Sequence, residues 1–145
     1  HLAVAVEGLL YLSESDYPFT VVTVADAASD PLTADTIKAA IEPVYVNRNG
    51  EPTLEERTVE VWTLDRFFDR LVTPQDWWEE YNYQQQTQYI ELQRILTEEV
   101  NDAQCFRLGD VDGSSGDLSG AIDVYLVGSS SNGDLVGVWT ISVET

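Results

Sequence analysis

Carboxylates on a short turn are the first residues that could do chemistry. Glu14 and Asp16 lie in the hexapeptide formed by residues 13–18. Pro18 cannot continue a helix, so we expect a turn between a helix and a strand. Carboxylates raised on such a turn can meet a cation or an arginine of a partner. The same residues also fit a simple helix stop with two solvated acids.

Two adjacent tryptophans, Trp77 and Trp78, are the second candidate. Before them, Thr73 fits a helix N-cap and Pro74 the first helical position. Asp76 fits the N3 position, from which its side chain can complete a capping box. Capping explains those three residues without any function. It does not explain the tryptophan pair, because consecutive helical residues point about 100° apart. We therefore expect one tryptophan to be an exposed anchor for a partner.

The carboxyl end, Val143-Glu144-Thr145, is the third candidate. The last apolar strand residue, Val143, lies close to the end, so the carboxylate of Thr145 is expected beside a rigid sheet edge. A carboxylate and a hydroxyl are hard oxygen ligands of the kind that magnesium accepts. The alternative is an ordinary frayed terminus.

The rare residues exclude several enzyme classes. The only histidine is His1 and the only cysteine is Cys105. Serine and cysteine hydrolases need an interior imidazole, and zinc sites need clustered histidines and cysteines. Asp110, Asp112 and Asp117 are spaced somewhat like a calcium loop, but its twelfth position is Ala121 instead of glutamate. An enzyme that uses two carboxylates stays open, although no pair is identified by sequence.

The charge balance is strongly acidic. The 145 residues include 26 Asp and Glu against 7 Lys and Arg, for a net charge of −19. Such a surface repels phosphates, which excludes direct nucleic-acid binding. The acidity fits either a halophilic source, where charge maintains solubility in brine, or a basic partner. No apolar run has membrane-spanning length and no signal peptide is visible, so we expect a soluble, cytoplasmic protein without a membrane contact.

Hydrophobic periodicity predicts an α+β fold with helices covering a sheet, formed by residues 1–145 as one domain. Its first helix begins at the first residue, so we expect that helix to be truncated, and to end near Leu12. The last strand alternates apolar residues with Thr140 and Ser142, which predicts a half-buried antiparallel strand. The main elements are expected at 19–25, 33–41, 58–63, 65–71, 74–100, 104–111, 122–127 and 135–143.

Four ordered segments resemble the nuclease A inhibitor family, over roughly half of the chain. They are residues 8–19 (GLLYLSESDYPF), 73–77 (TPQDW), 107–111 (RLGDV) and 123–128 (DVYLVG), the last followed by Gly137 and Val143-Glu144-Thr145. Residues 20–62 match poorly. Asp112–Ile122 looks like an insertion that lengthens a hairpin beside the binding edge.

The resemblance implies a three-layer α/β/α sandwich with a central, largely antiparallel sheet. It implies an inhibitor of a sugar-non-specific nuclease with a ββα-metal active site, and neither a catalytic residue nor a cofactor of its own. Glu14 would meet the basic catalytic residues of the nuclease. Thr145 would reach the partner's magnesium in place of a substrate phosphate, with Gln75 and Trp77 adding contacts. The alternative is an acidic binding module with a different basic partner.

Overall fold

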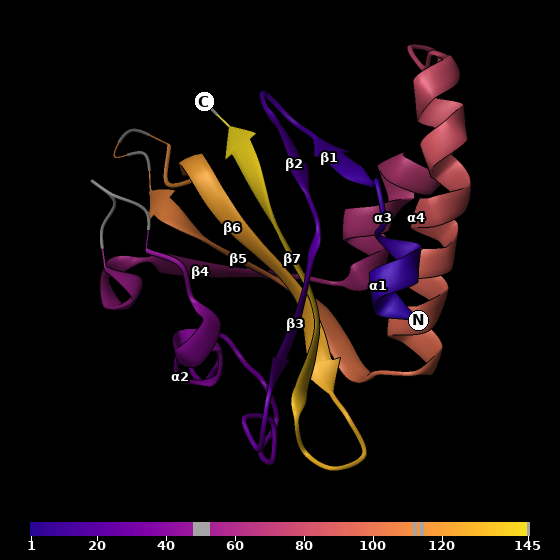
Figure 1. The fold of residues 1–145 in the computed structure, drawn as a ribbon. Helices are drawn as coiled ribbons and strands as arrows, with labels where there is room; N and C mark the ends of the chain where they lie inside the picture. The colour runs from indigo at the N-terminus through magenta and orange to yellow at the C-terminus, as the bar shows by residue number, and fades with distance from the viewer. Residues whose placement is uncertain (48–52, 112, 114, 145) are drawn as a thin grey trace.

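A five-stranded antiparallel sheet with the order β3-β7-β6-β5-β4 organises the molecule (Figure 1). The structure is a computed structural model that describes residues 1–47, 53–111, 113 and 115–144. The sheet strands are β3 (Thr20–Val24), β4 (Thr58–Trp62), β5 (Asn101–Val111), β6 (Leu118–Ser129) and β7 (Leu135–Glu144). A separate two-stranded hairpin is formed by β1 (Leu10–Leu12) and β2 (Asp16–Pro18). The helices are α1 (Leu2–Ala5), α2 (Ile37–Ile41), α3 (Leu64–Val72) and α4 (Glu80–Glu98), with 3₁₀ turns at Glu42–Val44 and Leu54–Glu56. The predicted α+β class is confirmed.

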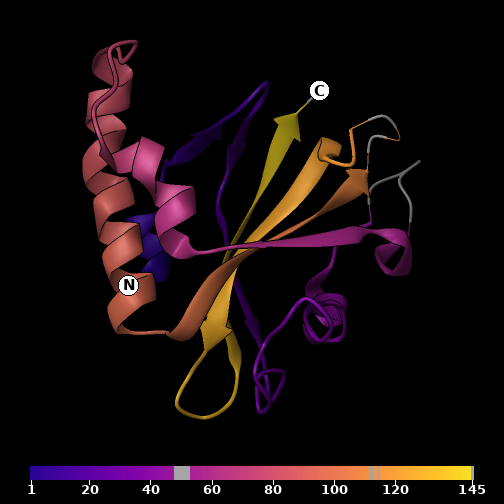
Figure 2. The ribbon, with the colours of Figure 1, turned by 180° about the vertical axis from the view of Figure 1, so that it is seen from behind.

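Both faces of the central strand β6 are buried. Val124 and Leu126 belong to an apolar cluster that includes residues of α3 and α4, whereas Tyr125 and Val127 belong to one that includes residues of α2. Because side chains alternate along a strand, an uninterrupted apolar run requires cover on both faces. Figures 1 and 2 show α3 and α4 on one side of the sheet and α2 on the other.

The prediction of a helix from Leu2 to Leu12 is wrong over its second half. Helix α1 ends at Ala5, and Gly8 has a φ of +73°, which a right-handed helix does not accommodate. Residues Leu10–Leu12 form a strand instead, and the Tyr89 hydroxyl donates a hydrogen bond of 2.8 Å to the Leu10 carbonyl. Packing against α4 therefore overrides the helical spacing of the leucines.

The long helix also begins later than predicted. Helix α3 continues to Val72, and Thr73 donates its N–H to the Asp69 carbonyl as the C-cap of α3. It cannot serve at the same time as the N-cap of a new helix. Helix α4 begins at Glu80, with Glu79 as N-cap and Asn82 closing its capping box. The predicted capping box at Thr73 is wrong, and the tryptophan pair lies in the loop between the helices.

The last strand is antiparallel as predicted, but it is not half-buried. Thr140 and Ser142, expected on a solvated face, are both buried. The Thr140 hydroxyl donates to the Pro18 carbonyl at 3.0 Å. The hairpin of β1 and β2 covers this part of β7, and local alternation in the sequence carries no information about that cover.

Candidate functional site

The turn between β1 and β2 presents Glu14 to solvent. The turn is closed by Ser13, whose N–H and hydroxyl both donate to the Ser15 carbonyl, at 3.1 and 2.9 Å. Glu14 lies at its tip and is exposed. The sequence predicted a turn with raised carboxylates here, and the structure has one, although a strand rather than a helix precedes it.

This turn is bonded directly to the end of β7. The Glu14 N–H donates to the Val143 carbonyl at 3.2 Å, and the Val143 N–H donates to the Ser13 hydroxyl at 2.9 Å. Figures 1 and 2 show the turn beside the end of β7. The two segments are 130 residues apart in the chain. Thr145, the predicted terminal ligand, lies outside the described residues.

The loop between α3 and α4 carries the other two predicted site residues. The Gln75 side-chain amide donates to the Thr73 carbonyl at 2.8 Å, which braces the loop. Trp77 is 63% exposed, whereas Trp78 packs edge-on against Tyr83 with ring centroids 5.0 Å apart. One tryptophan of the pair is therefore exposed, as the sequence analysis expected.

Two hollows connect the Glu14 turn, the loop that carries Trp77 and the end of β7. The first, of about 260 Å³, has Ser13, Arg70 and Trp77 in its wall. The second, of about 470 Å³, has Ser13, Glu14, Arg70 and Glu144 in its wall. Ser13 and Arg70 line both, so Glu14, Trp77 and the end of β7 belong to one continuous surface. We call the surface formed by Ser13, Glu14, Arg70, Trp77 and Glu144 the hairpin edge.

An arginine holds the hairpin edge from the α3 side. The Arg70 guanidinium donates a hydrogen bond of 2.6 Å to the Tyr11 hydroxyl, and its carbon lies 5.8 Å from the centre of the Tyr11 ring. Tyr11 is buried and stacks on Phe67 at 5.3 Å. The hairpin is therefore fixed to α3 by both apolar and polar contacts.

Glu144 is fixed by a buried arginine, which sequence reasoning did not identify. The Arg107 guanidinium donates to Glu144 Oε1 at 3.0 Å, and the Ser142 hydroxyl donates to Glu144 Oε2 at 2.7 Å. Burial alone would raise the pKa of Glu144, but these hydrogen bonds and the positive charge of Arg107 hold it below its ordinary value. The sequence indicates this role only by placing a charged residue, Arg107, inside an otherwise apolar strand.

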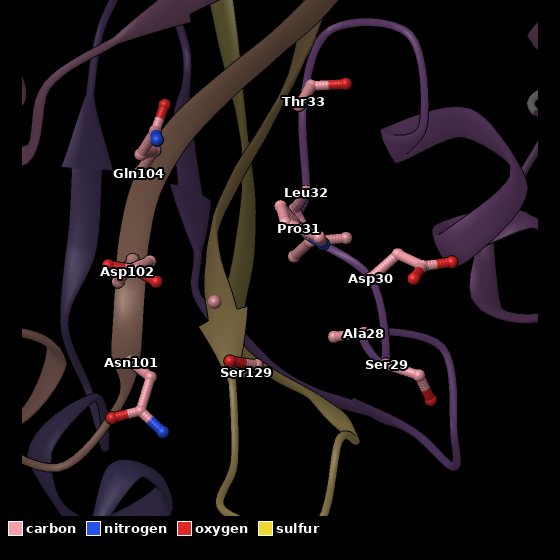
Figure 3. Close-up of a pocket in the computed structure, with 12 residues that line it drawn as sticks. Ala28, Ser29, Asp30, Pro31, Leu32, Thr33, Asn101, Asp102, Gln104 and Ser129 are labelled. Atoms are coloured by element: carbon pink, nitrogen blue, oxygen red, sulfur yellow. The ribbon is translucent and has the colours of Figure 1, made fainter.

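A cleft larger than either hollow lies at another part of the sheet, and its described lining includes none of the predicted site residues. It has a volume of about 620 Å³ and lies between the start of β5 and the loop of residues 28–33. Figure 3 shows Asn101, Asp102 and Gln104 on the strand opposite that loop. The cleft therefore does not coincide with the hairpin edge.

The rival chemistries gain no support from the described residues. No group of three or more His, Cys, Asp or Glu side chains there is arranged to hold a metal. In the calcium-like segment Asp110 lies 3.7 Å from Arg57, and Asp112 is outside the described part. The pKa values of Glu56, Glu91 and Glu144 are all lowered, by hydrogen bonds to the carboxylate, so none of these three is poised as a catalytic acid. None of the helices formed by the described residues combines the length and the hydrophobicity that a membrane span requires.

Comparison with known proteins identifies the family. A search of curated proteins found no match. A family model described as nuclease A inhibitor-like protein matches residues 1–145. This family implies a nuclease A-type partner, which agrees with the resemblance in the sequence. Because the match covers the whole chain, the protein belongs to the nuclease A inhibitor-like family, whose members are inhibitor proteins and not enzymes.

Proposed function

We propose that the protein inhibits a sugar-non-specific nuclease with a ββα-metal active site by inserting the hairpin edge into that site. The observation that carries the proposal is the pair of hydrogen bonds between the Glu14 turn and Val143. They bring an exposed carboxylate and the end of β7 to one rigid surface. An inhibitor gains affinity from such preorganisation, because less conformational entropy is lost on binding.

Two carboxylates would replace the substrate phosphate. A nuclease site that holds phosphate presents a divalent cation and basic side chains, and both attract anionic oxygens. In our proposal Glu14 pairs with the basic catalytic residues, and the terminal carboxylate of Thr145 reaches the nuclease's magnesium. Neither group offers a phosphodiester bond to cleave. The nuclease would therefore be occupied without turning over.

Gln75 and Trp77 would add contacts beside the two carboxylates. Trp77 is 63% exposed and lines the same hollow as Ser13. Exposed tryptophans are enriched among residues that dominate interface energies, because they bury a large area with few rotatable bonds. The net charge of −19 would further accelerate encounter with a basic cleft.

We also infer the finer architecture that accompanies this function, a three-layer α/β/α sandwich in which residues 1–145 form one domain. Its support is the pair of apolar clusters on the shared sheet, one with residues of α3 and α4 and the other with residues of α2. A single sheet between two helical layers would give the edge a stiff base.

The direct test is a titration of the protein into a ββα-metal nuclease in the presence of magnesium, with DNA cleavage as the readout. We expect cleavage to stop near one equivalent of inhibitor. Continued cleavage at several equivalents would refute the proposal for that nuclease. In that case, capture of one other basic protein through the same edge would favour the alternative, an acidic binding module.

A further inference from the structure

Arg107 is a buried charge in the middle of the sheet. The residue lies on β5 and is 3% exposed. A buried guanidinium is stable only where carboxylates and hydrogen-bond acceptors replace its hydration. Its Nε donates to Glu60 Oε1 at 3.0 Å, and its Nη2 donates to Glu144 Oε1 at the same distance. The arginine thus joins β4 to the end of β7 across the sheet.

A tryptophan fixes the plane of this guanidinium. The central carbon of Arg107 lies 4.0 Å from the centre of the Trp62 ring. The guanidinium of Arg66 lies 4.1 Å from the centre of the same ring. Cation–π contacts of this kind restrict the orientation of an arginine, so the fork that meets Glu144 is preorganised.

Glu144 occupies the last register position of β7. Its partner on β6 is Gly120, the final pair of the ladder between the two strands. Glu144 is held through its side chain by Arg107 and Ser142, and its neighbour Val143 bonds to Ser13 and Glu14. The side-chain clamp and the main-chain bonds to the turn therefore act on adjacent residues.

We propose that Arg107 is a positioning residue for the hairpin edge: by holding Glu144 it fixes the end of β7, and through Val143 it fixes the turn that carries Glu14. Arg107 itself is too buried to touch a partner, so it acts only through these groups. The structural part of this proposal stands on the contacts above, and its consequence for inhibition rests on the proposed function.

Arg57 offers a matched control. It is the same residue type, 2% exposed, and bonded to the same sheet. Its Nη2 donates to the carbonyls of Leu108 and Ala121, both at 2.8 Å, and its Nη1 lies 3.4 Å from Asp123. Replacing either arginine by lysine perturbs a buried cation, but only Arg107 contacts Glu144.

The first experiment measures amide hydrogen exchange and needs no nuclease. We expect Arg107→Lys and Glu144→Gln to speed exchange at the Glu14 and Val143 amides by on the order of tenfold, relative to the Tyr125 amide in the central strand. Arg57→Lys should show no such preference for the edge. The proposal would be overturned if the Glu14 and Val143 amides kept their protection in both Arg107→Lys and Glu144→Gln. Because the Glu144 side chain is 40% exposed, Glu144→Gln remains informative even if Arg107→Lys does not fold.

The second experiment measures coupling in inhibition. We expect Arg107→Lys to weaken inhibition by on the order of tenfold, and to add little when Glu14→Gln is already present, because both changes disable one unit. Arg57→Lys should combine additively with Glu14→Gln. Additive behaviour of Arg107→Lys would contradict the positioning role. If the unaltered protein inhibits no nuclease, the proposed function fails, whereas the exchange experiment still decides the structural claim.

Discussion

Arg57 and Arg107, the two buried arginines of the part of the chain that the structure describes, have partners of different kinds. Arg57 donates to main-chain carbonyls and faces Asp123, which is completely buried. Arg107 faces Glu60 and Glu144, whose side chains are 38% and 40% exposed. Arg57 donates hydrogen bonds to main-chain carbonyls inside the sheet, and a half-exposed partner, Asp110, is more distant at 3.7 Å. Both carboxylates that pair with Arg107 are partly exposed and lie at 3.0 Å. We therefore expect Arg57 to stabilise the fold as a whole and Arg107 to order the hairpin edge.

The largest expected effect on stability is the loss of the interior pair. Arg57→Ala removes the guanidinium that lies 3.4 Å from the buried Asp123 carboxylate, and we expect a loss of about 3–5 kcal/mol in the free energy of unfolding. Urea denaturation measures it. The fraction that remains folded should inhibit a nuclease as the unaltered protein does. A loss below about 1 kcal/mol would place Arg57 in the same class as a surface residue.

The largest expected effect on binding alone is Glu14→Ala. Removing a carboxylate that pairs with a basic nuclease residue should cost about 2–5 kcal/mol of binding free energy. Stability should hardly change, since Glu14 is exposed at the tip of the turn. The inhibition constant gives the measurement, and Asp16→Asn, an exposed acid on the same hairpin, is the control. Equal inhibition by the Glu14 and Asp16 variants would return Glu14 to the role of a solvated acid.

Extending the chain beyond Thr145 tests the terminal carboxylate. A short tag after this residue should weaken inhibition at least tenfold, about 1.4 kcal/mol, while the unfolding midpoint stays constant. The midpoint should hold because Val143 still anchors the strand to the turn. The same tag at His1 serves as the control. Full potency of the carboxyl-terminal fusion would exclude a metal ligand at that end.

The smallest expected effect is the pH dependence of the edge clamp. The folded-state pKa of Glu144 lies below its unfolded value, so the carboxylate contributes stability above the unfolded pKa and loses it as the pH falls through the folded pKa. For a partly exposed group the contribution should stay below about 1 kcal/mol. Unfolding free energies of the unaltered protein and Glu144→Gln should thus differ near pH 7 and converge in acid. A difference independent of pH would assign the effect to packing.

The architecture was predictable wherever local patterns agreed with burial. The apolar runs of residues 104–111 and 122–127 predicted two strands, and the alternation of apolar residues with Thr140 and Ser142 predicted the last strand. The tryptophan pair stood out because helix capping does not explain two adjacent tryptophans, whereas Glu14 on its turn also fitted a helix stop with solvated acids. Leu10–Leu12 misled the prediction, because the leucine spacing fits a helix, while pairing with β2 and the hydrogen bond from Tyr89 hold these residues as a strand.

The positioning residues were beyond sequence reasoning. Arg107 lies 47 residues from Glu60 and 37 from Glu144. Hydrophobic periodicity and helix-capping patterns relate only residues close together in the chain, and a single sequence shows no covariation. A charge within an apolar strand shows that partners must exist. It does not show which carboxylates supply them.

The sequence by itself determined the acidic surface, the absence of an interior histidine and the antiparallel strands at the end of the chain, because composition and side-chain alternation are local properties. Only the tertiary structure decided that the Glu14 turn meets Val143 and that Arg107 holds Glu144. Those contacts depend on strand order, register and sheet twist, which arise from packing the whole chain around a common core.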